Sequence, residues 1–359
     1  MPLEKPKNEM KIIKLKNFWK NKKVFITGHT GFKGAWLCIF LNLLGAKIYG
    51  FSLKEESNSL FHIVKKKLKL KNNIYGNIGD YKKLNNILKK VNPHIVFHFA
   101  AQSIVQEGYS NSRNTFETNI NGTNNLLHSL GGLSNLKSVV IATSDKVYKE
   151  SSKKIFNEND ELGGYDPYSL SKVCKELIVK GFKNSFFAKR LKKVNISTVR
   201  AGNIIGGGDQ GKNRLIPDII NSKKTLRIRN PKSIRPWQYI LDALYGYILI
   251  AEKQYLKKIK SSSWNLGPDK INIISVNKII KIFSLHLKLP KIKYDRRSSF
   301  KESKYLIINN KKAKKELNWK PKINIELAVK KTVQWHAKRK KLDNPKKICE
   351  FQILEYLNL

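Results

Sequence analysis

Cysteines and long apolar runs are scarce in this chain of 359 residues. The three cysteines, Cys38, Cys174 and Cys349, are too few and too widely spaced for a disulfide framework or a zinc site. We therefore expect no bound metal and a reducing, cytoplasmic compartment. The Lys-rich start, from Met1 to Lys23, has no continuous apolar stretch, which argues against a secretory signal. No run elsewhere is long enough to cross a bilayer, so we expect no membrane partner.

Acidic side chains are also few: 26 Asp and Glu residues stand against 71 Lys and Arg residues, which gives a formal net charge of +45. One interpretation is a nucleic-acid partner, which would make the chain a basic, non-catalytic binding protein. The other is a bias of composition, because the lysines are spread along the whole chain. We favour the second interpretation, in which no nucleic acid is bound and the positive field attracts an anionic small-molecule substrate.

Apolar strands alternate with amphipathic helices from Lys23 onward, and 41% of the residues are hydrophobic. This alternation predicts an α/β protein with a Rossmann-type doubly wound parallel sheet and a smaller mixed α/β C-terminal substrate lobe. The predicted strands are 24–27, 47–52, 94–100, 138–144 and 195–201, and the predicted helices are 33–44, 81–91, 115–130, 168–188 and 239–254. The predicted parts are a loosely docked leader (1–20), a nucleotide-binding domain (21–202 with about 238–268) and the substrate lobe (203–237 and 269–359).

A glycine-rich loop follows the first predicted strand and opens the first predicted helix. Gly28, Gly31 and Gly34 have the spacing G-x-x-G-x-x-G. Such a loop lets backbone N–H groups approach a pyrophosphate, and the positive end of the helix favours its negative charge. Because the loop stands at the first strand–helix junction of an alternating chain, it predicts a dinucleotide site rather than a plain tight turn. The residues between the glycines that we assign to this site are Thr30, Phe32 and Lys33.

The end of the second strand bears on the choice between NAD and NADP. An acid at this place would bind the ribose 2′-OH of NAD, but the sequence has Ser52 and Lys54, with no acid before Glu55. The residues alone therefore tolerate the 2′-phosphate of NADP, although Ser52 can also meet a ribose hydroxyl. The other residues assigned to the cofactor from their places after strands are Asp80, Ala100, Ala101 and Gln102.

Tyr168 and Lys172 have the spacing Y-x-x-x-K, which places both side chains on one face of a predicted helix. A lysine ammonium beside a phenol favours the phenolate, so we expect Lys172 to lower the pKa of Tyr168. The preceding strand ends in Ser144, Asp145 and Lys146, where an active-site strand end belongs. Ser144 can bond a sugar hydroxyl, Asp145 can act as a general acid, and Lys146 can stabilise an enolate or act as a base.

Several segments together resemble the extended short-chain dehydrogenase/reductases, and others resemble the CDP-glucose 4,6-dehydratase subgroup within them. The first group is TGHTGFKG (27–34), HFAAQ (98–102), TNINGT (118–123), TSDKVY (143–148) and YDPYSLSK (165–172). The second group is RAGNIIGGGD (200–209), RLIPDII (214–220), IRNPKSIRPWQ (228–238) and WNLGP (264–268). The resemblance implies NAD held throughout turnover, which we prefer to NADP, and a CDP-hexose substrate.

The reaction implied by this resemblance is an intramolecular redox dehydration that yields CDP-4-dehydro-6-deoxyglucose. Tyr168 takes the proton of the C4 hydroxyl while hydride passes to the cofactor, water is eliminated across C5 and C6 with Asp145 as the acid, and hydride returns to C6. Related dTDP-glucose dehydratases have a glutamate, assigned as the C5 base, where this chain has Lys146. The identity of the C5 base is therefore open here. Asn119, Tyr168 and Lys172 are also assigned to the cofactor site.

The substrate side is inferred from residue type, because arginine forks match phosphate oxygens. An epimerase, reductase or dehydratase acting on another nucleotide sugar remains an alternative, since all share the glycine loop and the Tyr-Lys spacing. The resemblance also implies a homodimer or higher homo-oligomer. The residues assigned to the substrate are Asn203, Arg214, Arg229 and Arg235.

Overall fold

The computed structural model describes residues 7–151, 155–185, 194–211, 213–260, 262–294, 306–342 and 344–359. Its centre is a seven-stranded sheet in the order β12-β7-β5-β4-β1-β2-β3. Every neighbouring pair in this sheet is parallel. The strands are β1 (Lys23–Thr27), β2 (Lys47–Ser52), β3 (Leu70–Tyr75), β4 (Ile95–His98), β5 (Ser138–Ala142), β7 (Asn195–Arg200) and β12 (Ser263–Asn265).

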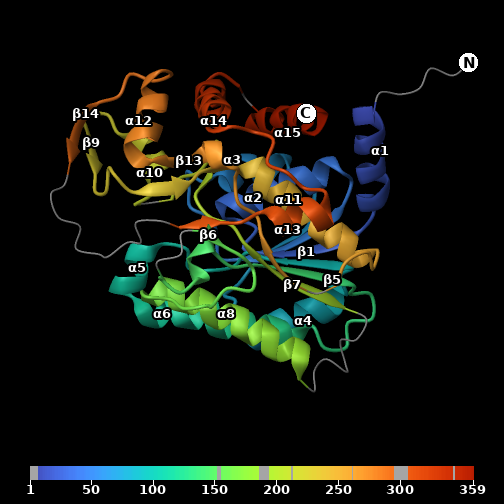
Figure 1. Ribbon diagram of the computed structural model, residues 1–359. Helices are drawn as coiled ribbons and strands as arrows, with labels where there is room; N and C mark the ends of the chain where they lie inside the picture. The colour runs from blue at the N-terminus through green and yellow to red at the C-terminus, as the bar shows by residue number, and fades with distance from the viewer. Residues whose placement is uncertain are drawn as a thin grey trace, which may run out of the picture.

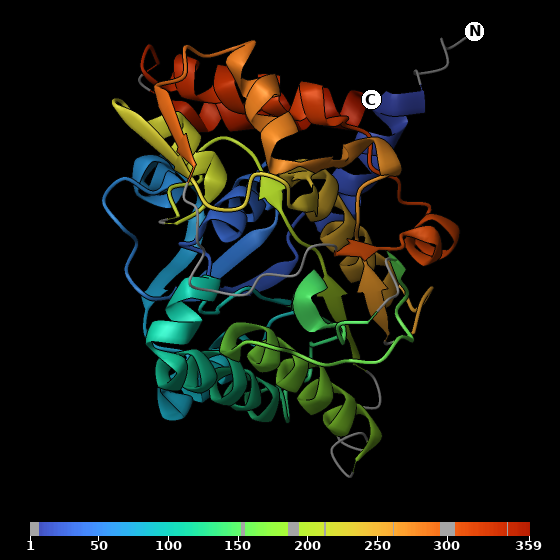
Figure 2. The ribbon, with the colours of Figure 1, turned by 60° about the vertical axis from the view of Figure 1, so that its left-hand side comes forward.

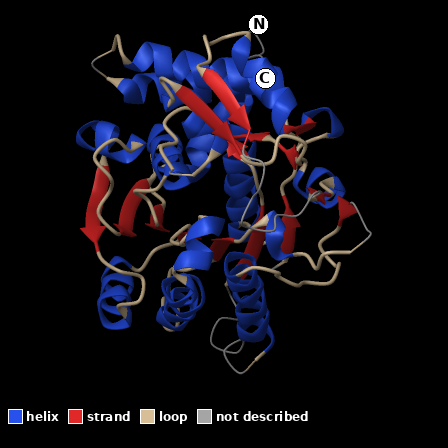
Figure 3. Ribbon diagram, turned by 90° about the vertical axis from the view of Figure 1, so that its left-hand side faces the viewer, coloured by secondary structure: helices blue, strands red, loops and turns tan. Residues whose placement is uncertain are grey.

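The strand order confirms the predicted doubly wound sheet. It reverses between β1 and β4, the point at which such sheets bind nucleotides beyond the carboxyl ends of their strands. Alternating side chains of β1 show that both faces are covered: Val24 and Ile26 pack into one core, and Phe25 packs into the other. The strands therefore lie between two layers of helices (Figures 1 and 3).

One helical layer consists of α4 (Tyr81–Val91), α7 (Gly122–Ser129) and α8 (Pro167–Asn184), and the opposite layer contains α2 (Phe32–Leu43) and α11 (Ile240–Tyr255). The helix predicted over 115–130 is interrupted, because a π-helical turn at Glu117–Asn121 separates α6 (Ser112–Phe116) from α7. The helix predicted over 168–188 ends at Asn184, and 186–188 lie outside the described residues.

The expectation of a loosely docked leader is wrong for residues 7–19. They form α1 (Lys7–Trp19), which packs against the C-terminal helix α15 (Pro345–Asn358), beside which it lies in Figure 2. Leu15 and Trp19 are buried in the main core, and the Trp19 ring stacks 6.3 Å from that of Phe97. Burial of the large Trp19 side chain stabilises the packing of α1 against the core. The Lys-rich composition of the segment did not predict this packing.

Smaller elements border the sheet and bring distant parts of the chain together. Strand β9 (Thr225–Ile228) pairs with β14 (Lys291–Tyr294), and β10 (Ile234–Pro236) pairs with β13 (Ile273–Ser275). These pairs join the two stretches assigned to the substrate lobe. Helix α15 departs from that assignment, because it packs against α2 of the nucleotide-binding part. The remaining elements named in Figure 1 or below are α3 (Leu60–Val64), α5 (Val105–Ser110), β6 (Ile155–Phe156), β8 (Ile204–Ile205), α10 (Leu215–Asn221), β11 (Gln238–Tyr239), α12 (Val276–Ser284), α13 (Lys311–Leu317) and α14 (Ile325–Arg339).

Within the described ranges, no helix is both long enough and apolar enough to cross a membrane. The same residues contain no group of three or more His, Cys, Asp or Glu side chains arranged to hold a metal ion.

Candidate active site

A cavity of about 830 Å³ lies beyond the carboxyl ends of β1, β4, β5 and β7. The glycine loop and the segment after β4 line one part of it, and the segments after β5 and β7 line another. The predicted site residues that line the cavity are Gly28, Thr30, Gly31, Phe32, Lys33, Gly34, Ser52, Ala100, Ala101, Gln102, Ser144, Asp145, Lys146, Tyr168, Asn203, Arg214, Arg229 and Arg235. Parallel strands end at the same edge of the sheet, which is why residues so distant in sequence meet here.

The glycine loop has the shape of a cradle for a pyrophosphate. Gly28 has φ +74°, and a Cβ there would lie 2.5 Å from the backbone nitrogen of Ala100. A Cβ at Gly34 would overlap the carbonyl oxygen of Gly28. Gly31 is the N-cap of α2, and its helix start receives no side-chain cap. The first backbone N–H groups of α2 therefore face the cavity without a capping side chain, and they suit a dinucleotide phosphate.

At the far end of the loop, the Thr30 hydroxyl lies 2.7 Å from that of Ser52. Glu55, the first acid after β2, also lines the cavity, and its carboxylate accepts hydrogen bonds from Lys65 (2.5 Å) and Tyr75 (2.7 Å). The first acid after β2, Glu55, thus lies at this end of the cavity, whereas β2 itself ends in Ser52.

Asp80, which the sequence assigned to the cofactor, does not line the cavity. Its carboxylate caps α4 by accepting a hydrogen bond from the Lys83 backbone N–H (3.0 Å). Asn77 and Ile78 line the cavity in its place. A cap satisfies an otherwise unpaired backbone donor, which is the commonest use of Asp at this position.

Tyr168 and Lys172 lie together on α8, with the Lys172 Nζ 5.4 Å from the centre of the Tyr168 ring. Burial raises the pKa of Tyr168 to about 12, although a hydrogen bond with Ser144 opposes this shift. Burial, reinforced by the charge of Lys33, lowers the pKa of Lys172 to about 7. Burial is the largest influence on both groups: it raises the pKa of Tyr168 above its usual value, and it reduces the fraction of Lys172 that is protonated.

Asp145 and Lys146 begin a short 3₁₀ turn (Asp145–Val147) directly after β5. The Ser144 hydroxyl donates to Asp145 Oδ1 (2.9 Å) and accepts from the Lys146 backbone N–H (3.2 Å). Asn203 donates to Asp145 Oδ2 (3.4 Å), and a Cβ at Gly202 would overlap the carboxylate. Burial raises the pKa of Asp145 even though the charge of Lys146 opposes it, which favours the neutral acid that can donate a proton.

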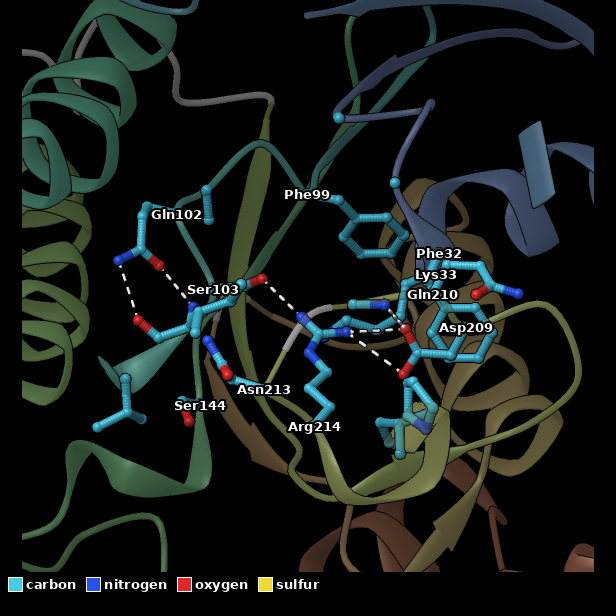
Figure 4. A pocket seen from close by; sticks show the side chains of 18 of the residues that line it. Phe32, Lys33, Phe99, Gln102, Ser103, Ser144, Asp209, Gln210, Asn213 and Arg214 are labelled. Carbon is cyan, nitrogen blue, oxygen red and sulfur yellow. Dashed lines mark hydrogen bonds and ion pairs between the residues drawn. The ribbon is translucent and has the colours of Figure 1, made fainter. Parts of the chain in front are cut away.

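Arg214 lies within the cavity wall, between Asp209 and Ser103 (Figure 4). Its Nη1 is 3.2 Å from Asp209 Oδ1, and its Nη2 donates to the Ser103 hydroxyl (2.7 Å). Arg229 donates hydrogen bonds to the Gln106 side chain (3.2 Å) and to the Asn213 carbonyl (3.2 Å). Arg235 also lines the cavity, so all three arginines assigned to the substrate belong to its wall.

Asn119 acts behind the cavity wall and does not line it. Its Oδ1 accepts from the Gln102 backbone N–H (2.9 Å), and its Nδ2 donates to the Gln102 carbonyl (3.0 Å) and to the Ser171 hydroxyl (2.8 Å). The side chain thus joins the segment after β4 to α8. Lys172 is likewise absent from the cavity wall and lies behind Tyr168.

A buried network that was not predicted from the sequence lies behind these residues and contains Glu176, Arg200 and Tyr148. Arg200 binds the Glu176 carboxylate (2.9 Å) and donates to the Tyr148 hydroxyl (2.9 Å). A signal was present, because Glu176 follows Lys172 at helical spacing and Arg200 lies at the end of a predicted strand. A charged residue at either place requires a partner when it is buried.

Comparisons with known proteins agree with this geometry. A family model described as GDP-mannose 4,6 dehydratase matches residues 25–332. The CDP-glucose 4,6-dehydratase of Salmonella typhimurium is 41% identical over 331 residues, which cover 89% of this chain and 92% of that protein. The solved epimerase Mth375 of Methanothermobacter thermautotrophicus has a TM-score of 0.79 at 21% identity, covering 94% of this chain and 98% of that one.

A second solved structure, the dTDP-glucose 4,6-dehydratase of Bacillus anthracis in complex with NAD, has a TM-score of 0.74 at 21% identity and covers 90% of this chain and 99% of that one. The folds agree over nearly the whole chain, and the family model spans the glycine loop, the turn after β5 and the Tyr168 helix. The chain therefore belongs to the GDP-mannose 4,6 dehydratase family, within the extended short-chain dehydrogenase/reductases.

Proposed function

We propose that this protein is a CDP-glucose 4,6-dehydratase that uses NAD. One observation carries the proposal: a buried acid with a raised pKa, Asp145, and the Ser144–Tyr168 hydroxyl pair line a single cavity. An epimerase needs the hydroxyl pair but no acid for loss of water, whereas a dehydratase needs both. The identity of 41% to the Salmonella typhimurium CDP-glucose 4,6-dehydratase, across 92% of that protein, supports the choice of CDP-glucose as substrate.

The residues present fit NAD. The glycine cradle and the uncapped start of α2 suit its pyrophosphate. The solved dTDP-glucose 4,6-dehydratase of Bacillus anthracis, which shares this fold, is a complex with NAD. When bound, NAD would supply reversible hydride transfer. Lys33, Ala100 and Gln102 line the passage between the cradle and Tyr168.

The chain's own residues handle the protons. Tyr168 and Ser144, which are hydrogen-bonded to each other, hold the C4 hydroxyl, and Tyr168 takes its proton. Lys172, whose pKa of about 7 leaves much of it neutral, accepts the proton that Tyr168 passes on. Asp145 protonates the C6 hydroxyl, which leaves as water. The C5 proton passes to a base whose identity Lys146 leaves open, and the charge of Lys146 stabilises the enolate formed by loss of that proton.

The test is mass spectrometry of the products formed by purified protein from CDP-glucose, and in parallel from dTDP-glucose, UDP-glucose and GDP-mannose, with NAD or NADP added. We expect loss of one water from CDP-glucose alone, and more rapidly with NAD. Water loss from another nucleotide sugar would keep the mechanism and overturn the substrate. An unchanged mass with every substrate, despite bound cofactor, would contradict the dehydratase function and favour an epimerase.

We further propose that the protein is a cytoplasmic homodimer. The three cysteines are free, which suits a reducing compartment. Helix α8 exposes Leu170 and Leu177 on its outer side, where a second copy can cover them. Light scattering on purified protein measures the mass, and a monomer at micromolar concentration would contradict the dimer. Cell fractionation tests the compartment.

A further inference from the structure

A buried ion pair between Glu176 and Arg200 lies behind the active site. It joins helix α8 to strand β7. Arg200, the last residue of β7, donates from Nε to Glu176 Oε1 (2.9 Å) and from Nη2 to Oε2 (3.0 Å). Both side chains are only 3% exposed. Burial alone would raise the pKa of Glu176, but the hydrogen bonds and charge of Arg200 hold it below its usual value, so the carboxylate remains an anion.

This pair holds the turn that contains Asp145 and Lys146 at both of its ends. On the near side, Thr143 donates from Oγ1 to Glu176 Oε1 (2.7 Å). On the far side, Arg200 Nη1 donates to the Tyr148 hydroxyl (2.9 Å), and its guanidinium carbon lies 5.0 Å from the centre of the Tyr148 ring. The residues between these two attachments are those assigned to the elimination of water.

The Glu176 carboxylate belongs to α8, the helix that contains Tyr168, which is assigned to oxidation at C4. Glu176 lies on α8, one helical turn beyond Lys172 and two beyond Tyr168. Bonds from Thr143 to Glu176 therefore connect the residue before Ser144 directly to the Tyr168 helix. The spacing between the C4 chemistry and the C5–C6 chemistry depends on this buried connection.

We propose that Glu176 and Arg200 are positioning residues that hold the Asp145 turn against the Tyr168 helix, so that oxidation at C4 and elimination across C5 and C6 occur on one bound sugar. This inference rests on the dehydratase function proposed above. Loosening the connection slows elimination, because a small displacement of Asp145 or Lys146 separates it from C5 and C6. Substrate affinity changes little, because Arg214 and Arg229 belong to other segments.

The test compares Thr143→Val with Thr198→Val. Thr198 donates to the same carboxylate over a similar distance (2.6 Å), but it lies inside β7 and is not attached to the turn. Each variant removes one hydroxyl bond from Glu176 and preserves the side-chain shape. We expect Thr143→Val to lower kcat for CDP-glucose by roughly 10- to 100-fold with KM nearly unchanged, and Thr198→Val to keep kcat close to that of the wild type. Their Tm values should fall by similar amounts.

Tyr148→Phe tests the other end of the turn, because it removes the hydroxyl that accepts from Arg200. We expect it to behave like Thr143→Val, with reduced cofactor accumulating in rapid-mixing absorbance because oxidation outpaces elimination. An equal loss of kcat in Thr198→Val and Thr143→Val, or a loss confined to KM, would overturn the positioning role. If the wild type fails to dehydrate CDP-glucose, the proposed substrate is wrong, and the three variants are compared on the nucleotide sugar that it does convert.

Discussion

Burial shifts the proton equilibria around the cavity in opposite directions. It raises the pKa of Asp145 and brings that of Tyr168 to about 12, whereas it lowers the pKa of Lys172 to about 7 and that of Lys33 to about 8. In each case the neutral form gains. These shifts favour the protonated acid at Asp145 and the neutral amine at Lys172, which are the forms that the proposed dehydration uses.

The pH dependence of the reaction follows from Lys172. Its neutral form accepts the proton, so we expect kcat/KM to rise with pH through about 7. Lys33→Met removes a nearby positive charge that lowers the pKa of Lys172, so this rise should move to higher pH. The pH profiles of kcat/KM for the wild type and for Lys33→Met are measured from steady-state rates between about pH 5.5 and 9, where such groups titrate. A rise that stays at the same pH in Lys33→Met would contradict the assignment.

Asp145→Asn keeps the size of the side chain and removes the acid. We expect dehydration to fall by roughly 10²- to 10⁴-fold, while oxidation at C4 continues, because Tyr168 and Ser144 are unchanged. Product analysis measures the first effect, and absorbance of the reduced cofactor measures the second. A variant that still releases the dehydrated sugar at the wild-type rate would exclude Asp145 as the acid.

At the scale of elements, α2 depends on the absence of side chains at its start. A Cβ at Gly34 would overlap the Gly28 carbonyl, whereas a Cβ at Gly181, on the exposed side of α8, meets nothing within 4 Å. We expect Gly34→Ala to weaken NAD binding by at least about tenfold, a loss of about 1.4 kcal/mol, through displacement of the cradle. Gly181→Ala should bind normally and gain about 0.5–1 kcal/mol of stability. Cofactor titration and thermal unfolding measure both variants, and normal NAD binding by Gly34→Ala would contradict the cradle.

Elements with a strong apolar pattern could be predicted from the sequence, and those without one could not. The strand at 47–52 and the helix at 81–91 lie where they were predicted, because their apolar residues follow one period throughout. Strand β3 was missed because Leu70–Tyr75 is mostly exposed and contains two asparagines. Helix α1 was missed because its lysines dominate the composition, although Leu15 and Trp19 are buried and Ile12 and Phe18 pack beside them.

The site shows the same division. Residues that follow a strand in a distinctive motif, such as Asp145 and Tyr168, could be placed in the cavity from the sequence. Asp80 could not be assigned correctly, since a helix cap and a ligand contact use the same residue type after a strand. The roles of Glu176 and Arg200 depend on the pairing of β5 with β7, which brings Thr143 next to them and which no local pattern specifies.

At the scale of the whole molecule, a buried carboxyl joins the sheet-covering helix α11 to the C-terminal segments. Asp242 accepts hydrogen bonds from the Lys322 backbone N–H (2.7 Å) and from the Tyr356 hydroxyl (2.9 Å), and burial raises its pKa to about 7. A raised pKa means that the folded state holds the proton more tightly than the unfolded state does. The stability from this group is fully present below about pH 4 and is lost as the pH rises through about 7.

Asp242→Asn should therefore flatten the dependence of unfolding free energy on pH between about 4 and 7, and its stability relative to the wild type should improve by a few kcal/mol across that interval. Denaturant titrations at several pH values measure the effect. A wild-type curve that rises over the same interval while the variant stays flat would show the opposite linkage and exclude this role for Asp242.

The position of α15 has a consequence for the order in which the protein matures. Helix α15 packs against both α1 and α2, so a segment translated long after these two helices covers them. The glycine-loop helix α2 therefore gains this partner only after α15 has left the ribosome, and until then its apolar side remains available to chaperones. A message truncated by a single late stop codon would therefore impair the nucleotide cradle, although every residue of that cradle would already have been translated.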